Sequence, residues 1–178
     1  MKISEHSSQF SDVLISSGVN FNDDRGQFKK TIFGDQVIEI MGDVKELLCV
    51  NSLKNVIRGL HFQLPPHATS KFLTCINGKI LDVFLDIRQN SKNYGKFGVQ
   101  ILEEKDDKGL FIPKGYAHGY SVVSDKATVV YLQSENYNED SDFGINPLSV
   151  GIDWGIDSPI ISKKDSESVD FQDFITSF

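Results

Sequence analysis

Apolar residues in this chain alternate with polar ones, or gather in short blocks that end at Gly, Asn, Asp or Pro. A period of two is typical of strands, and few windows repeat at the spacing of a helix. In the early part of the chain the pattern predicts short strands at residues 13–15, 27–32 and 47–50. It predicts only short helical segments, of a turn or two, within residues 33–48 and 170–178.

The clearest local signal is that of a hairpin. Residues 71–76 and 79–87 are apolar blocks separated by Asn77 and Gly78. This dipeptide accepts the positive φ angles of a tight type I′ turn. The first block is therefore expected to fold back and pair with the second.

A second pair of strands is expected further along the chain. Residues 109–123, with a bend at Pro113 and Gly115, are followed after a short break by residues 127–137. Many short strands with frequent turns predict an all-β domain with antiparallel sheets. A jelly-roll barrel fits better than an immunoglobulin-like sandwich, because the Cys and Trp spacing of the latter is missing. The polar tail from Ser158 is expected to lie over the barrel.

Length and charge narrow the class of protein. With 178 residues, 39% of them hydrophobic, the chain is long enough for one domain, residues 1–178. A formal net charge of −7 argues against nucleic acid and anionic membranes as partners, so any anionic ligand needs a local cluster of cations. No apolar run has the length of a signal peptide core or a membrane span, which predicts a cytoplasmic protein. Cys49 and Cys75, both in apolar runs, are expected to be reduced thiols in the core.

Two of the four histidines, His61 and His118, stand in unusual sequence contexts. A histidine in a strand is more often a hydrogen-bonded structural residue than a catalyst, so each is a weak signal on its own. Residues 113–119 match the pattern PxGxxHG, which resembles the second motif of the cupins, small β-barrels that often bind a metal. A metal cupin also needs a His-x-His pair, but His61 is followed by Phe62 and Gln63. We therefore expect neither a metal nor another cofactor, and acid–base histidines inside a barrel.

Five longer motifs follow one another along the chain: RGLHFQ (58–63), KFLTCINGKILDVFLDIR (71–88), FIPKGYAHGY (111–120), VVYLQSENY (129–137) and GIDW (151–154). In this order and spacing they resemble the dTDP-4-dehydrorhamnose 3,5-epimerases, and the resemblance covers nearly the whole chain. It implies a cupin-type double-stranded β-helix, that is, a jelly-roll barrel with short peripheral helices, and a homodimer. It also implies a nucleotide-diphospho-sugar substrate, in deoxysugar synthesis for surface polysaccharide.

The chemistry of such an enzyme places demands on its side chains. In a 4-keto sugar the C–H bonds at C3 and C5 are acidic, because the carbanion spreads onto the keto oxygen. Inversion then needs a base on one face and a proton donor on the other. The resemblance implies that His61 is the base, Asp165 the carboxylate that orients it, Lys71 the cation beside the enolate oxygen and Tyr131 the donor. Each of the last three has a structural alternative: a solvated tail charge, an exposed strand-end lysine and a buried structural tyrosine.

The resemblance also assigns residues to substrate binding. Arginine forks pair with phosphate oxygens in a bidentate way. Asp82 shares a strand face with Ile80 and Phe84, so it is expected to point into the barrel and orient His118. The implied contacts are Arg25, Arg58, His118 and Lys164 for the diphosphate and sugar, and Phe21, Tyr137 and Asn51 for the nucleoside.

Some residues depart from the family pattern near the expected nucleotide. Members usually carry Glu at the position of Lys30, Gln at that of Cys49 and Glu at that of Asp142, and the loop at residues 52–55 is usually longer. Donors and acceptors near a base set nucleotide specificity. We therefore hypothesise that the substrate carries CDP, GDP or UDP in place of dTDP.

Two other functions stay open at this point. A sugar-nucleotide 3,4-ketoisomerase on the same fold also moves protons beside a keto group. A non-catalytic sugar-binding cupin would be expected to have lost the base or the donor. The presence of His61, Lys71, Tyr131 and Asp165 favours the epimerase. Whether C3, C5 or both are inverted is left open by the sequence.

Overall fold

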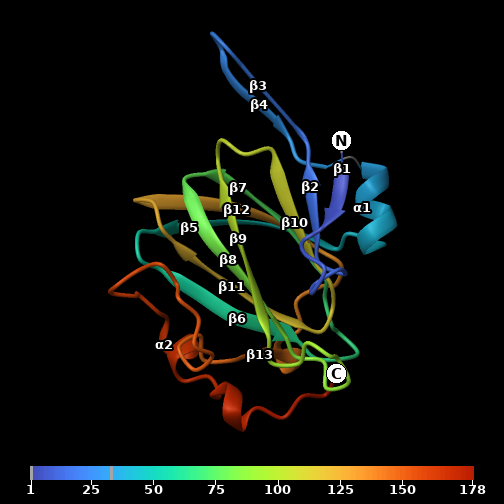
Figure 1. The fold of residues 1–178 in the computed structure, drawn as a ribbon, viewed down its shortest axis with the longest axis vertical. Helices are drawn as coiled ribbons and strands as arrows, with labels where there is room; N and C mark the ends of the chain where they lie inside the picture. Colours follow the sequence, from blue (N-terminus) through green and yellow to red (C-terminus); the bar gives the residue numbers. More distant parts are fainter. Residues whose placement is uncertain (1, 33) are drawn as a thin grey trace.

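Two antiparallel sheets face each other across the core, and a two-stranded arm projects beyond them (Figure 1). The computed structural model describes residues 2–32 and 34–178. In spatial order, the six-stranded sheet consists of β1 (Lys2–Glu5), β2 (Leu14–Ser17), β10 (Lys108–Ile112), β7 (Lys71–Asn77), β12 (Lys126–Gln133) and β5 (Glu46–Leu53). The five-stranded sheet consists of β13 (Asp142–Gly144), β6 (Ile57–Gln63), β11 (Tyr116–Val122), β8 (Lys79–Asp86) and β9 (Phe97–Glu103). The arm consists of β3 (Val19–Asp23) and β4 (Gly26–Lys30).

Strands that follow one another along the chain mostly lie in different sheets. β5, β7, β10 and β12 belong to the six-stranded sheet, whereas β6, β8, β11 and β13 belong to the five-stranded sheet. Within the fully described stretch from β5 to β13, only β8 and β9 are both consecutive and paired. This alternation is that of a jelly-roll barrel, and it confirms the predicted all-β, cupin-type fold.

The dipeptide Asn77-Gly78 does not close a hairpin, so that prediction is wrong. β7 pairs with β10 and β12, while β8 pairs with β9 and β11. Gly78 has a φ of 74°, so the chain does reverse sharply here, but the reversal carries it from one sheet to the other. A local turn signal sets the direction of the chain. Which strands then pair depends on where their apolar faces are buried.

The second predicted pair is wrong for the same reason. β11 and β12 lie in different sheets, and the predicted bent strand over residues 109–123 is two strands, β10 and β11, on either side of Pro113 and Gly115. No strand was predicted at the positions of β1, β3, β6, β9 or β13. β9 lies at an edge of its sheet, and its residues Val99 and Ile101 are exposed, so its apolar pattern does not mark a buried face.

Helices are few and short, as predicted, and the early strands overlap the predicted runs. α1 (Gly34–Met41) lies within the predicted segment 33–48, the end of which belongs to β5. Phe33, also part of that prediction, lies outside the described residues. The buried face of α1 packs on the six-stranded sheet. A 3₁₀ turn, Glu139–Ser141, precedes β13.

The C-terminal segment covers the face of the five-stranded sheet that points away from the barrel interior (Figure 1). Within the predicted segment 170–178 the structure has a single 3₁₀ turn, Phe171–Asp173, and residues 174–178 belong to no helix or strand. α2 (Lys163–Ser166) has no counterpart among the predicted helices. A helix this short contains too few residues to show a period of 3.6.

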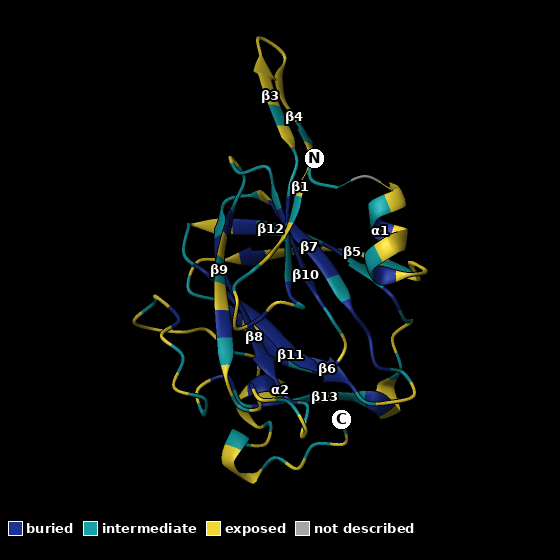
Figure 2. Cartoon of the chain, turned by 45° about the vertical axis from the view of Figure 1, so that its right-hand side comes forward, coloured by how far each residue is buried: buried dark blue, intermediate teal, exposed yellow. Residues whose placement is uncertain are grey.

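Side chains at alternate positions of β8 and β11 belong to two apolar clusters, one between the sheets and one under the C-terminal segment. Figure 2 shows these strands mostly buried and the arm exposed. Leu73, Phe84 and Val129 are fully buried between the sheets. Cys75 lies in the same cluster, and burial raises the pKa of its thiol to about 11. Cys49 is exposed on β5, so the prediction of a second core thiol is wrong. None of the helices in the described chain has the length and apolar content that a membrane span requires.

Candidate active site

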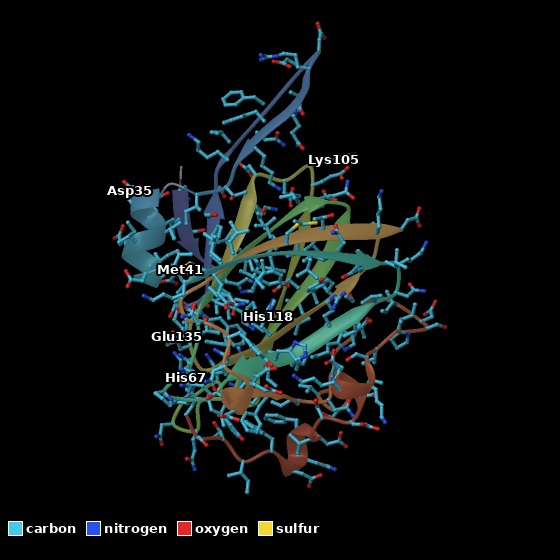
Figure 3. The ribbon with its side chains drawn as sticks, turned by 180° about the vertical axis from the view of Figure 1, so that it is seen from behind. Asp35, Met41, His67, Lys105, His118 and Glu135 are labelled. Carbon is cyan, nitrogen blue, oxygen red and sulfur yellow. The ribbon has the colours of Figure 1, made fainter. Side chains whose placement is uncertain are left out.

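A cleft of about 620 Å³ lies between the two sheets, with β5, β7 and β12 on one side and β6 and β11 on the other. Inward-facing residues of these strands form its walls, so the jelly-roll topology brings together segments that are far apart in the sequence. Figure 3 shows His118 in the middle of the molecule. The predicted site residues that line the cleft are Arg58, His61, Lys71, His118, Tyr131, Tyr137 and Asp142.

His61 and Asp165 form a hydrogen-bonded pair at the cleft. Nε2 of His61 on β6 lies 2.8 Å from Oδ1 of Asp165 on α2, and the carboxylate also accepts the N–H of Gly59 at 3.2 Å. Ser162 caps α2 by accepting the N–H of Asp165 at 3.1 Å. Burial on its own raises the pKa of Asp165, but the hydrogen bonds from His61 and Gly59 and the attraction of the imidazole together hold that pKa below its ordinary value.

This contact defines the tautomer of His61. A carboxylate only accepts hydrogen bonds, so Nε2 carries a hydrogen, and in the neutral imidazole Nδ1 then has the lone pair. Nδ1 has no hydrogen-bond partner within the described residues, and the side chain is 37% exposed. Its lone pair is therefore available to a ligand in the cleft. A basic nitrogen backed by a carboxylate is the arrangement of a general base.

Lys71 lies next to this pair. Its Nζ donates a hydrogen bond to the carbonyl oxygen of His61 at 3.1 Å. Burial lowers the pKa of Lys71 to about 8, and the attraction of Asp142 and Asp82 opposes this only in part. An ammonium with so little water around it interacts strongly with an anion that forms beside it.

A second imidazole–carboxylate pair lies deeper in the barrel. Nε2 of His118 is 2.8 Å from Oδ2 of Asp82, and both side chains are buried. Burial raises the pKa of Asp82 and lowers that of His118, although each partner opposes the shift of the other. Oδ1 of Asp82 has no hydrogen-bond partner in the described part of the chain. His118 pairs with His61 in the register of β11 and β6, so the two imidazoles occupy neighbouring strands.

Tyr131 reaches the cleft from the sheet opposite to that of His61. It lies on β12, and its ring meets that of His118 edge-on, with the centroids 5.8 Å apart. Burial raises the pKa of the Tyr131 hydroxyl well above its usual value, so the phenol stays protonated at neutral pH. The hydroxyl has no hydrogen-bond partner among residues 2–32 and 34–178. A buried phenol without a protein partner is available as a donor to a ligand.

Cations lie in and beside the cleft, although the chain as a whole carries a net charge of −7. Lys164 donates to Oδ2 of Asp142 at 2.6 Å, and this hydrogen bond raises the pKa of the ammonium. Arg58 donates from Nε to Oγ of Ser52 at 2.8 Å. Tyr137 is 60% exposed and lines the cleft.

Three predicted binding residues belong to the arm or its base, away from the cleft of the same chain. Phe21 on β3 is 63% exposed. Arg25, at the turn of the arm, pairs with Asp23 at 2.6 Å, and Lys30 ends β4. The arm projects beyond both sheets, so it does not bring these side chains to the cleft within one chain (Figure 1).

Two further predicted residues lie on the outer side of β5. Cys49 and Asn51 are exposed, whereas Ser52 is buried, as expected for alternate positions of a strand. Oδ1 of Asn51 accepts a hydrogen bond from Thr128 at 2.7 Å and does not line the cleft. The side chains of Cys49 and Asn51 are therefore not gathered with His61.

The prediction missed other cleft residues, of which Tyr120 is the largest fully buried side chain. Tyr120 lies two positions after His118 on β11, so strand alternation places both on the same face. That alternation was the signal by which it could have been found. Within the described chain, no three His, Cys, Asp or Glu side chains form a group that would hold a metal ion.

Comparison with known proteins places this geometry in a family. The family model of dTDP-4-dehydrorhamnose 3,5-epimerase matches residues 7–173. The chain is 39% identical over 163 residues to a dTDP-4-dehydrorhamnose 3,5-epimerase of Escherichia coli (strain K12), covering 88% of each chain. It is 36% identical over 167 residues to the protein of the same name from Shigella flexneri, covering 91% of this chain and 92% of that one.

A solved structure gives the same picture in three dimensions. The dTDP-6-deoxy-D-glucose-3,5-epimerase of Legionella pneumophila Philadelphia 1, in complex with dTDP-4-keto-L-rhamnose, matches this fold with a TM-score of 0.86. The two chains are 29% identical, and the match covers 94% of this chain and 91% of that one. The family model, the sequence relatives and the fold agree over nearly the whole length, so this chain belongs to the dTDP-4-dehydrorhamnose 3,5-epimerase family of isomerases.

Proposed function

We propose that this protein inverts both C3 and C5 of dTDP-4-dehydro-6-deoxyglucose, with His61 as the base and Tyr131 as the proton donor. The observation that carries the proposal is the 2.8 Å contact between His61 and Asp165 at a cleft that Lys71 and Tyr131 also line. The Legionella relative with dTDP-4-keto-L-rhamnose bound supports the substrate class. The product is a deoxysugar nucleotide for surface polysaccharide.

Proton removal begins on the face of the sugar that meets His61. Its Nδ1 lone pair takes the proton from C3 or C5, and the electron pair of the broken C–H bond moves onto the keto oxygen. Lys71 stabilises the enolate charge as it forms, and Asp165 stabilises the imidazolium. The two charges that appear in this step are therefore stabilised by separate groups of the cleft.

Proton return takes place on the other face. Tyr131 belongs to the six-stranded sheet and His61 to the five-stranded sheet. A sugar ring held between these walls has the base on one side and the phenol on the other, which supports inversion. The electron pair returns from the enolate to form a bond between the carbon and the Tyr131 proton. The phenolate regains a proton from solvent, and His61 releases its proton to solvent.

The substrate's diphosphate needs positive charge, which Arg58 and Lys164 supply, with Tyr137 beside the nucleoside. We place the rest of the nucleotide site on a second copy of the chain. In a homodimer, the arm of the partner subunit would bring the aromatic ring of Phe21 and the guanidinium of Arg25 to this cleft. The exposure of Phe21 and the projection of the arm support this assignment (Figure 1).

The proposed nucleotide is dTDP, in place of the CDP, GDP or UDP considered from the sequence. Lys30 and Cys49, two of the unusual residues, lie outside the cleft of their own chain. The ligand of the Legionella relative favours dTDP.

Incubation with the 4-keto-6-deoxy sugar nucleotide in deuterated water tests the function. With the dTDP-linked sugar, the proton NMR signals of both C3 and C5 are expected to disappear while an epimerised product accumulates. The CDP-, GDP- and UDP-linked sugars, run in parallel, should react at least about tenfold more slowly. Exchange at neither carbon, as in a non-catalytic binding protein, or migration of the carbonyl to C3, as in a 3,4-ketoisomerase, would overturn the proposal. Loss of the C3 signal alone would restrict it to a 3-epimerase.

The alkaline side of the pH profile is expected to follow Lys71. Its ammonium is charged below a pKa of about 8 and neutral above it, so kcat/KM should fall as the pH rises through about 8. Lys71→Arg keeps a positive charge at all accessible pH values, so the decrease of kcat/KM in this variant should begin at least about one pH unit higher. The measurement is the initial rate of epimerisation between about pH 6 and pH 10. An identical alkaline limb in both proteins would contradict the role given to Lys71.

A further inference from the structure

Three side chains beside the cleft form a hydrogen-bonded chain that the steps above do not use. Oγ of Ser52 lies 2.8 Å from Nε of Arg58 and 3.0 Å from the hydroxyl oxygen of Tyr120. Ser52 and Tyr120 are buried, with relative exposures of 6% and 1%. The chain joins β5, β6 and β11, and both Arg58 and Tyr120 line the cleft.

Strand pairing fixes the place of each of these residues. Tyr120 lies opposite Arg58 in the register of β11 and β6, and residues paired in this way have Cβ atoms about 5 Å apart. Ser52 belongs to the buried positions of β5, and its neighbour Asn51 offers a backbone carbonyl to Nη2 of Arg58 at 3.4 Å. The support for the guanidinium therefore comes from neighbouring strands, beside an irregularity in the β6–β11 register between His118 and Tyr120.

The directions of the hydrogen bonds follow from the chemistry of the three groups. Arginine only donates, so Ser52 must accept from Nε and uses its remaining lone pair or its hydrogen toward Tyr120. One edge of the guanidinium is thereby held by Ser52 and the carbonyl of Asn51. The Tyr120 hydroxyl also lies close to the guanidinium, because its hydrogen bonds with Ser52 and Arg58 oppose the rise that burial causes in its pKa. Arg58 lines the cleft, so the N–H groups that point to none of these three residues remain for a ligand there.

We propose that Ser52 and Tyr120 are positioning residues that hold Arg58 in the orientation that binds the diphosphate of the substrate; this rests on the proposed function. A guanidinium pairs with two phosphate oxygens only when its planar fork is correctly aimed. An arginine already held in place loses less side-chain freedom on binding than a mobile one. Ser52 and Tyr120 thus act on the diphosphate through Arg58.

Calorimetric titration of the full-length protein with dTDP and with thymidine tests this assignment. Ser52→Ala is expected to weaken dTDP binding by about tenfold, since it removes the acceptor of a charged hydrogen bond. Thymidine lacks the diphosphate, so its affinity should stay within about twofold. In the epimerase assay KM should rise by a similar factor while kcat stays within about twofold.

Matched variants separate positioning from a general loss of structure. Ser52→Thr keeps the hydroxyl and should restore dTDP binding, whereas Tyr120→Phe leaves Ser52 as an acceptor and should weaken dTDP by only about threefold. Ser121→Ala is the control: it removes a buried hydroxyl that donates to the carbonyl of Trp154 at 2.6 Å, outside the cleft lining. It should bind dTDP like the wild type.

Two outcomes would overturn the proposal. One is wild-type affinity for dTDP in Ser52→Ala, and the other is an equal loss of affinity for dTDP and thymidine. If Ser52→Ala does not fold, Ser52→Cys, with its weak acceptor, gives the same comparison. A wild-type protein that exchanges neither the C3 nor the C5 proton would overturn the proposed function, whereas an active wild type with an unaffected Ser52→Ala would overturn only the positioning role.

Discussion

Replacing His61 with alanine is expected to lower the rate of deuterium incorporation at both C3 and C5 by about 10³-fold or more. In the proposed mechanism the Nδ1 lone pair of His61 is the base at both carbons. Asp165 contacts the imidazole and does not line the cleft, so it is not expected to take over this role. Substrate binding should change little, since the cations near the diphosphate are kept. The measurement is the decay of the two proton NMR signals in deuterated water.

His67→Ala is the matched control for this experiment. His67 follows β6 and does not line the cleft, and it contacts Gln63 through its backbone carbonyl, which the substitution preserves. Its exchange rates should equal those of the wild type. If His61→Ala exchanged either proton at more than about a tenth of the wild-type rate, another group would have to be the base at that carbon.

Tyr131→Phe is expected to separate the two halves of the reaction. His61 is intact in this variant, so deuterium should still enter at C3 from the face of the base, with retained configuration. Delivery from the opposite face lacks its donor, so the rate of epimer formation should fall by a factor of about 10² or more. Chromatographic separation of the epimers, combined with NMR of the exchanged positions, measures both rates in one sample.

Tyr116→Phe controls for the loss of a buried tyrosine hydroxyl. The Tyr116 hydroxyl donates to Asp12 at 2.8 Å and accepts from Arg88 at 2.7 Å, away from the cleft. Its removal should lower the stability of the fold and leave the ratio of exchange to epimerisation unchanged. A Tyr131→Phe protein that formed the epimer as fast as the wild type would show that another group donates the proton.

The residues around His61 were assigned through the family resemblance, whose motifs lie on strands of the barrel. Motifs on β6, β7, β11 and β12 carry Arg58, His61, Lys71, His118 and Tyr131, and the barrel brings these strands to one cleft. Asp165 was assigned in the same way, and nothing in a polar tail by itself predicts a 2.8 Å contact with an imidazole on a distant strand.

Other contacts of the site could not be predicted from the sequence, because they depend on how distant strands are arranged. The role of Ser52 depends on a three-strand contact with Arg58 and Tyr120, which no local pattern encodes. Phe21 and Arg25 sit on an arm whose direction depends on how β3 and β4 leave the barrel. Their predicted contact with the nucleotide stays a prediction.

The fold shows a similar division between local and long-range information. Alternation along the chain predicted most strands, and the Asn77-Gly78 turn was placed correctly as a reversal. Pairing was predicted wrongly, because a hairpin and a corner between two sheets begin with the same dipeptide. The choice between them depends on long-range partners, which β7 finds in β10 and β12.

Asp165 belongs to the C-terminal segment that covers the five-stranded sheet, and this position affects how the enzyme can lose activity. The last barrel strand ends at Gly144, and the carboxylate meets His61 across 104 positions of sequence. Displacement of α2 from β6 would remove the carboxylate from His61 and leave the imidazole without its partner. Partial detachment of the C-terminal segment requires less free energy than unfolding of the whole barrel. The epimerisation rate is therefore expected to fall when the C-terminal segment detaches, before any measurement of strand content changes.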